Sequence, residues 1–255
     1  MNLHHARVAL RERSLVDVLD LAIRFCVTHA GAYARMSLVM IAPAFATTWS
    51  VAQAHGWWVA WPLAVLLASL IDGCFVALAS RLVFGHARVR DALRATATVL
   101  HHLVAVRLVQ GIALLASLSL LGMPWLWLGA VLLFMPEVVV LERATLLEVW
   151  VRSFVVAHSG LGIAASARFL LSGLVGASVL FADMAGRELQ GILEIRPDPS
   201  ILEKGGSTLA LLGFWAVLPL VATTRFFVYL DVRTRAEGWD IQTRFAALVA
   251  RTDSP

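Results

Sequence analysis

The chain has 255 residues, of which 60% are hydrophobic and 15% are charged, and its mean hydropathy is +0.80. Soluble domains carry charge on roughly a quarter of their residues, so this composition argues against a soluble globular protein and favours the bilayer as solvent. The net charge is +4, but the arginines stand at the ends of apolar blocks instead of covering one polar face, which argues against nucleic-acid binding.

Six apolar stretches approach the roughly 20 residues that a membrane-spanning helix needs. In chain order they are residues 33–51, 57–82, 103–121, 124–141, 161–184 and 207–230. Pro43, Pro136 and Pro219 predict a kink or an interruption in the first, fourth and sixth of them. The sequence therefore predicts an all-α, polytopic membrane protein with six transmembrane helices in one membrane domain, 1–240, and a cytoplasmic tail, 241–255.

An amphipathic stretch precedes the first, third and fifth of these spans. The polar positions are Asp17, Asp20, Arg24 and Thr28 in the first stretch, Asp91, Arg94, Thr98 and His102 in the second, and Thr145, Glu148 and Arg152 in the third. The spacing of three, then four residues places each set on one helical face, which predicts three amphipathic helices on the cytoplasmic side. They lie either on the membrane surface or as cytoplasmic extensions of the membrane helices.

The same three stretches suggest an internal threefold repeat. Residues 14–82, 87–141 and 143–230 each read as an amphipathic helix followed by a two-helix hairpin. The alternative is that any amphipathic helix shows such spacing, so the repeat predicts that the three units superpose.

The distribution of basic residues predicts the orientation. With the N-terminus inside, the outer side holds three of the 21 basic residues, Arg187, Arg196 and Lys204, all within residues 185–206. Six tryptophans then fall near the outer boundary: Trp49, Trp57, Trp58, Trp61, Trp125 and Trp127. The expected location is a bacterial inner membrane, with both termini in the cytoplasm.

Four charged residues interrupt the apolar blocks: Asp72, Arg107, Glu137 and Arg225. A charge at the bilayer centre costs about 2.5–3.5 kcal/mol on insertion scales, so each needs a partner or water. Asp72 is the deepest and could serve, with Arg107, as a proton or cation site. The alternative is a polar contact that joins helices, which is also the expected role of Glu137.

Charged residues near the membrane surface form the second set of candidates, as contacts for a partner or for lipid. They are Asp17, Arg24, Asp91, Arg94, Glu148, Arg152, Asp231, Arg233 and Arg235. Arg233 and Arg235 follow the last span and should face anionic lipid. The chain lacks a Walker A motif, a G-x-G-x-x-G motif and a G-x-S-x-G elbow, and its two cysteines have no paired spacing. No catalytic residue, metal or cofactor is predicted.

Three short stretches resemble the glycerophosphoryl diester phosphodiesterase membrane-domain family. They are Arg13-Ser14-Leu15 with Asp17 and Leu19-Asp20; Pro136 with Val140-Leu141-Glu142 and Arg152-Ser153; and Pro219 with Tyr229, Asp231, Arg233, Arg235 and Glu237-Gly238. The resemblance implies a helical membrane protein that stands alone without the phosphodiesterase. The chain has no phosphodiesterase domain and no His-Arg-Gly opening, so the resemblance carries over no catalytic residue.

The expected function is a non-enzymatic subunit or scaffold of a membrane complex, which engages a partner or lipid through the amphipathic helices. The alternatives are a transporter or channel that uses Asp72, and an integral-membrane enzyme that acts on lipid. Expected partners are membrane lipids and other membrane or cytoplasmic subunits, with a homo-oligomer left open and no nucleic acid.

Overall fold

A computed structural model describes residues 14–85, 88–118, 123–144, 146–194 and 199–237, and within these ranges every regular element is helical. The helices are α1 (Leu15–Thr28), α2 (Ala30–His55), α3 (Trp57–Phe84), α4 (Val89–Leu118), α5 (Met123–Val131), α6 (Met135–Glu137), the π-helix η2 (Val138–Glu142), α7 (Leu146–Ser159), α8 (Leu161–Ile192), α9 (Ile201–Lys204) and α10 (Thr208–Glu237). The predicted tail 241–255, the end of the third predicted span, Thr145 and Arg196 lie outside the described residues.

Three helices begin with the same chemical signal. The third residue of α1, α4 and α7 is an acid: Asp17, Asp91 and Glu148 respectively. An acid in the first turn is stabilised by the positive end of the helix dipole. In α1 the Ser14 hydroxyl also accepts from the Asp17 amide while the Asp17 carboxylate accepts from the Ser14 amide, which completes a capping box. The repeated sequence pattern therefore marks helix starts.

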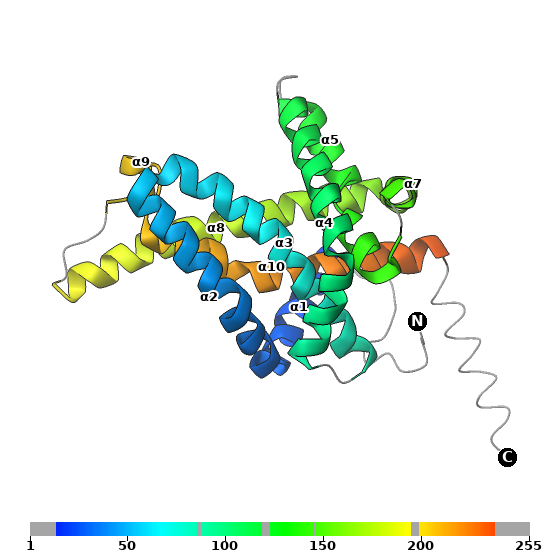
Figure 1. Cartoon of the computed structure of the whole chain (residues 1–255), viewed down its shortest axis with the longest axis horizontal. Coiled ribbons are helices and arrows are strands. Elements are labelled where there is room, and N and C mark those ends of the chain that lie inside the picture. Colours follow the sequence, from blue (N-terminus) through cyan, green and yellow to red (C-terminus); the bar gives the residue numbers. More distant parts are fainter. Residues whose placement is uncertain (1–13, 86–87, 119–122, 145, 195–198, 238–255) are drawn as a thin grey trace, which may run out of the picture.

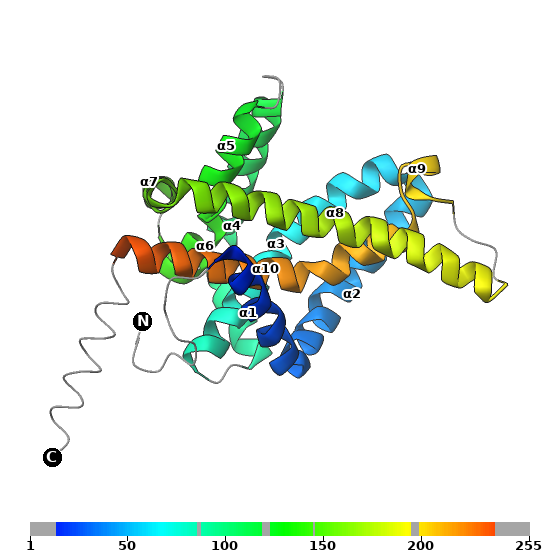
Figure 2. The same cartoon turned by 180° about the vertical axis from the view of Figure 1, so that it is seen from behind.

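The body of the protein is built around α3 and α10, the two most buried of the long helices. Helix α8 runs beside α10, α2 folds back on α3, and α1 lies against α10 (Figures 1 and 2). Phe25 of α1 meets Phe227 of α10 edge to face, with 5.3 Å between the ring centroids. The Tyr33 hydroxyl of α2 and the Thr223 hydroxyl of α10 share a hydrogen bond of 2.7 Å. Helix α10 is thus the common packing partner.

Close contact between α8 and α10 depends on one glycine. A Cβ atom on Gly213 would lie 2.5 Å from the Ser178 carbonyl oxygen and 2.6 Å from the Ala182 Cβ. The Ser178 hydroxyl donates to the Gly213 carbonyl at 2.9 Å across the same contact. Small residues at such crossings let helix backbones approach each other.

Gly213→Ala is therefore expected to destabilise the protein by about 1–3 kcal/mol, because the added methyl group forces α8 and α10 apart. Gly176→Ala in α8 is the matched control, since a Cβ there meets nothing within 4 Å, and alanine favours a helix over glycine by about 0.5–1 kcal/mol. Unfolding in detergent measures both. A Gly213→Ala protein as stable as the Gly176→Ala protein would contradict this reading of the interface.

Four helices, α3, α4, α8 and α10, are long and apolar enough to cross a membrane. These helices indicate a membrane protein, but six spans are not confirmed. The stretch predicted at 33–51 is helical within α2, which is long enough but less apolar than the other four. The stretch predicted at 124–141 is interrupted near Pro136, as that proline predicts: α5 ends at Val131, and the chain restarts as α6 and η2 around Pro136. Proline lacks the amide that would continue the helix.

The second predicted repeat unit differs from the other two. α1 and α7 are separate helices of 14 residues, each followed by a break before the next long helix. The amphipathic stretch that starts at Asp91 is continuous with the rest of α4, and α4 pairs with the short α5 as a hairpin that runs across α8 and α10 (Figure 1). The threefold repeat is therefore not confirmed.

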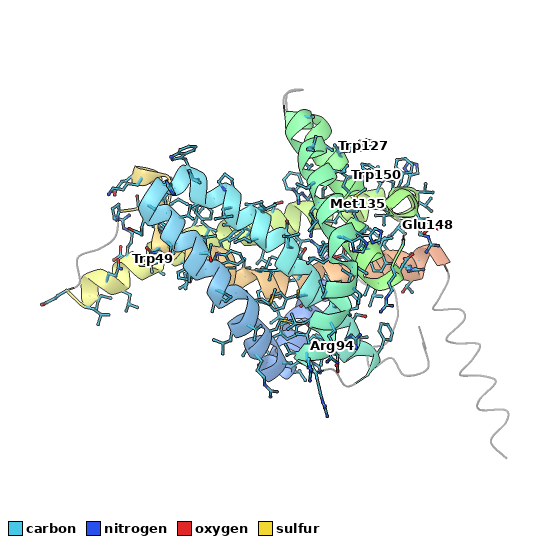
Figure 3. The ribbon with its side chains drawn as sticks, viewed as in Figure 1. Trp49, Arg94, Trp127, Met135, Glu148 and Trp150 are labelled. Carbon is cyan, nitrogen blue, oxygen red and sulfur yellow. The ribbon has the colours of Figure 1, made fainter. Side chains whose placement is uncertain are left out.

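The predicted tryptophan belt is also divided. Trp57 and Trp61 pack beside the 205–206 turn, where the Trp61 indole donates to the Gly205 carbonyl at 2.8 Å. Trp127 lies on α5, far from Trp49 at the end of α2 (Figure 3). The side chain of Trp125 lies outside the described part. Trp127 belongs to the hairpin that crosses α8 and α10, and it therefore lies apart from Trp49.

Candidate functional site

The four charged residues predicted inside the apolar blocks meet in one place, which we name the central ionic cluster: Asp72 of α3, Arg107 of α4, Glu137 of α6 and Arg225 of α10. Asp72 Oδ2 accepts from Arg107 Nη2 and, at 2.6 Å, from Arg225 Nη2. Arg225 Nε donates to Glu137 Oε1. Asp72, Glu137 and Arg225 are 3%, 0% and 7% exposed. The cluster joins four helices through side chains far apart in the sequence.

The Arg107 guanidinium is fixed by neutral groups as well as by Asp72. Its Nε donates to the Ser69 carbonyl at 3.0 Å, and its Nη1 donates to Gln110 Oε1 at 2.9 Å. The Gln110 amide in turn donates to the Leu132 carbonyl at 3.2 Å, in the turn that follows α5. The Leu132 carbonyl, which also accepts from the Met135 amide at 3.4 Å, thus becomes a partner for α4 and ties the broken helix to the cluster.

The formal charges within the central ionic cluster cancel, two arginines against two carboxylates. Buried ion pairs contribute little net stability, but removing one partner strands the other charge and is costly. Two carboxylate oxygens, Asp72 Oδ1 and Glu137 Oε2, are buried without a hydrogen-bond partner among the described residues. The cluster is therefore electrically neutral, but two of its carboxylate oxygens lack a hydrogen-bond donor among the described residues.

A second group, the Glu142 cluster, continues along the same side of α10. Glu142 Oε1 accepts from the Tyr229 hydroxyl at 2.6 Å and from Arg233 Nη1. Its Oε2 accepts from Arg152 Nη1 of α7 at 2.6 Å. Arg233 also donates to the Tyr229 hydroxyl at 2.7 Å. One carboxylate at the end of η2 thus holds α7 and α10 together.

The π-helix explains how two glutamates five residues apart can both face α10. In an α-helix, residues five apart point about 140° away from each other. The wider turn of a π-helix, with its i to i+5 hydrogen bonds, brings Glu137 and Glu142 closer to one face. Their partners Arg225, Tyr229 and Arg233 are spaced by four residues and form one stripe on α10. The π-helical turn of η2 thus places its two glutamates opposite the stripe of partners on α10.

The environment of Glu142 lowers its pKa below the ordinary value. Burial acts to raise the pKa, but the hydrogen bonds from Tyr229 and Arg152, together with the charge of Arg233, outweigh burial. A lowered carboxyl pKa stabilises the folded protein above the ordinary pKa of a glutamate, and this contribution is lost as the pH falls through the lowered value.

The residues predicted to contact a partner or lipid fall into two groups. Arg152 and Arg233 are occupied by Glu142, and Asp231 is buried and accepts from Arg235 at 3.0 Å. The remaining side chains lie at or near the surface: Asp17, Arg24, Asp91, Arg94 and Glu148. Arg24 pairs with Asp20 one turn away, at 2.9 Å. The first group therefore has contacts within the fold, whereas the second group lies where a partner could reach it.

One buried acid was not singled out from the sequence. Asp183, near the end of the fifth predicted span, accepts from the Ser207 hydroxyl and, at 3.2 Å, from the Ile201 amide. The Ser207 hydroxyl accepts in turn from the Ala210 amide at 2.9 Å, in the first turn of α10. Asp183 therefore fastens α8 to the start of α10, which is a structural role. In the sequence, the position of Asp183 at the edge of an apolar block was the feature that could have identified it as a buried acid.

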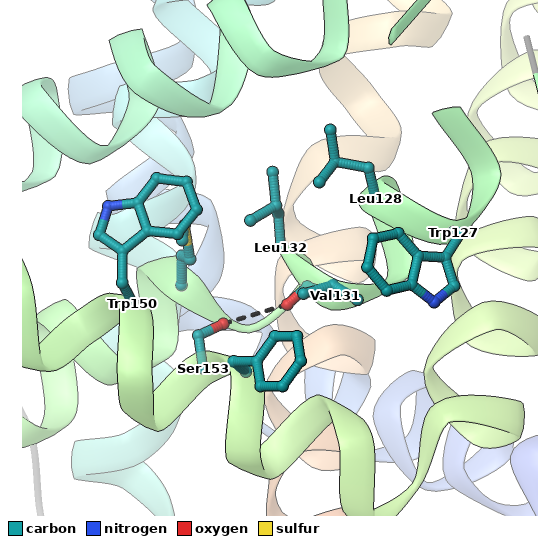
Figure 4. A pocket seen from close by; sticks show the side chains of 8 residues that line it. Trp127, Leu128, Val131, Leu132, Trp150 and Ser153 are labelled. Atoms are coloured by element: carbon teal, nitrogen blue, oxygen red, sulfur yellow. Dashed lines mark hydrogen bonds between the residues drawn. The ribbon is translucent and has the colours of Figure 1, made fainter. Parts of the chain in front are cut away.

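A hollow of about 190 Å³ lies between α5 and α7. Trp127 and Trp150 stand on opposite sides of it, with Leu128 and Leu132 between them (Figure 4). Ser153 is the one hydroxyl-bearing residue in this lining, and its hydroxyl donates to the Val131 carbonyl at 3.2 Å. The hollow thus offers an apolar surface and no charged group to a ligand.

Comparisons of the chain with models of protein families, with curated proteins and with solved structures return no match.

Proposed function

We propose that the chain is a non-enzymatic integral membrane protein that serves as a subunit or scaffold of a membrane complex. The observation that carries this proposal is that every charged side chain of the central ionic cluster is ion-paired within the chain. Charges that neutralise one another join helices and are not free to act on a substrate. We also propose membership of the glycerophosphoryl diester phosphodiesterase membrane-domain family, which the chain resembles in three short stretches and which would agree with a non-enzymatic membrane protein.

The proposed partner surface is the outer side of α1 and α7. Each helix packs on the body along one side and exposes valines beside charged residues on the other: Val16 and Val27 in α1, Val151 and Val155 in α7. Figure 3 shows Glu148 and Trp150 on α7. Such a face suits either the boundary of a bilayer or a second helix with a complementary face. We propose that this side is cytoplasmic, in a bacterial inner membrane, as the distribution of arginines favours.

Purification from the native membrane in a gentle detergent tests the proposal. A subunit should carry at least one other protein at a fixed ratio, quantified by mass spectrometry across independent preparations. A protein that purifies alone, or with lipid only, would contradict the scaffold proposal.

Transport of a proton or a small cation is the second candidate, favoured by one observation. Asp72 Oδ1 and Glu137 Oε2 are buried and have no hydrogen-bond partner among the described residues, so these oxygens could receive a proton, a water or a cation. Asp72→Asn should then abolish ion flux into vesicles that contain the purified protein.

The scaffold proposal expects a different result from the same variant. Asp72→Asn should lower stability by about 1–3 kcal/mol, because the amide pairs less well with Arg107 and Arg225, while partner binding persists. Unfolding in detergent and co-purification measure the two effects. Ion flux through the wild-type protein that Asp72→Asn removes would favour transport.

A further inference from the structure

A shallow groove of about 220 Å³ opens beside the first turns of α4, on the part of the molecule where Figure 3 labels Arg94. We name it the basic groove; its lining is Arg81, Asp91, Arg94, Ala95, Thr98 and Arg143. The three arginines come from three segments: the last turn of α3, the start of α4, and the residue after η2. Convergence from separate segments distinguishes the groove from a row of charges on one helix.

These arginines differ from those of the two ionic clusters. The side chains of Arg81, Arg94 and Arg143 have no hydrogen bond or ion pair with another described residue. Asp91 is the one acid in the lining, so the groove carries a formal charge of +2, from three arginines and one aspartate. Like charges held together repel unless an anion sits between them. The groove therefore has a net positive charge that attracts an anion.

The backbone at Arg143 has an uncommon conformation. Arg143 has a φ of 52° and a ψ of 33°, in the left-handed region that residues other than glycine seldom adopt. This conformation ends the π-helix and directs the chain away after Glu142 has met α10. Uncommon backbone conformations of this kind persist where the surrounding structure holds them, and they cluster at binding sites.

We propose that the basic groove binds a phosphate group, and that the phosphate belongs to an anionic phospholipid. A guanidinium group presents a planar fork of donors that matches phosphate oxygens. A phosphodiester carries a single negative charge, which the net positive charge of the groove attracts. α4 begins at Val89, so its positive helix end also faces this region. Arg81 closes a helix long enough to cross the membrane, which places the groove where headgroups lie.

This inference rests on the proposed membrane placement but not on the identity of any protein partner. The lipid would fill the space at the meeting point of α3, α4 and η2. The side chains that hold it are separate from the outer face of α7. Loss of lipid binding and loss of the partner can therefore be observed independently.

The test is native mass spectrometry of the purified full-length protein, titrated with phosphatidylglycerol and, separately, with phosphatidylcholine. The wild-type protein should retain phosphatidylglycerol in preference to phosphatidylcholine. The double variant Arg94→Gln/Arg143→Gln should weaken that binding by about tenfold or more, since two charge-assisted contacts are lost. Arg90→Gln is the matched control, because Arg90 is exposed in the same turn of α4 and does not line the groove.

Three results would overturn the proposal: no preference for phosphatidylglycerol, an unchanged double variant, or an equal loss in Arg90→Gln, which would indicate general attraction to surface charge. Inorganic phosphate that binds the wild-type protein but not the double variant, in a protein that shows no preference for phosphatidylglycerol, would overturn lipid as the source while keeping the phosphate site. An unfolding temperature near that of the wild-type protein is expected for both variants, since the side chains of these arginines have no hydrogen bond or ion pair with the part of the chain that the structure describes.

Discussion

Replacing Arg225 by methionine is expected to destabilise the protein by about 3–5 kcal/mol. Arg225 is buried and bonds both Asp72 and Glu137, so its loss strands Glu137 as an unpaired buried carboxylate and leaves Asp72 with Arg107 alone. The loss of free energy of unfolding can be measured by denaturant titration in a mild detergent. Arg24→Met is the control: Arg24 is exposed, its pair with Asp20 lies within one helix, and its loss should change the stability by about 0.5 kcal/mol or less.

A double variant separates charge pairing from loss of bulk. Glu137→Gln/Arg225→Met removes both members of the pair and should recover a large part of the stability lost in Arg225→Met. If the double variant is as unstable as the sum of the two single variants, the pair has no coupling and the proposed role of the central ionic cluster is wrong.

Inserting an alanine after Val139 is expected to turn Glu142 away from α10, because residues six apart share a face in neither an α-helix nor a π-helix. The contacts of Glu142 with Tyr229, Arg233 and Arg152 would be lost together. Hydrogen bonds to charged groups contribute about 1.5–3 kcal/mol each, and because those from Tyr229 and Arg233 share one acceptor oxygen we expect a total loss on the order of 3 kcal/mol. Denaturant unfolding of the insertion variant measures the effect.

Glu142→Gln is the control for the insertion, because it removes the charge but keeps the register of the helix. It should be less destabilised, since the amide oxygen still accepts from Tyr229 or Arg233. The difference in stability between the wild-type protein and the insertion variant should shrink as the pH falls through the lowered pKa of Glu142, where the wild-type carboxylate is protonated. An insertion variant as stable as the wild-type protein would mean that the register of η2 does not set the contacts of Glu142.

The buried charges could be identified from the sequence, but their pairing could not. A charge within an apolar block needs a partner, which singles out Asp72, Arg107, Glu137 and Arg225. The partners are separated by 35, 88 and 153 residues, so the pairs exist only once the helices have packed. Only the neighbourhood of Asp72 and Arg107 was expected beforehand.

The helix boundaries agree with those expected from the apolar blocks where the sequence contains a clear helix-breaking or helix-starting residue. Pro136 marked the interruption of the fourth predicted span, and the acids at Asp17, Asp91 and Glu148 lie in the first turns of α1, α4 and α7. The π-helix has no such local signal, because its three valines, its leucine and its glutamate fit a regular helix equally well, and its register is set by contacts with α10. Likewise, no proline or glycine separates the amphipathic part of α4 from its apolar part, and the two form one helix.

We propose that the buried charges stabilise the fold and that the outer face of α7 binds a partner. One comparison tests both roles. The measurement is the molar ratio of co-purified protein to this chain, by mass spectrometry, for the wild-type protein, for Asp72→Asn and for Glu148→Lys/Val151→Ser. We expect Asp72→Asn to keep the wild-type ratio and the α7 variant to lose the partner while remaining folded. A ratio that collapses in Asp72→Asn but persists in the α7 variant would contradict the account.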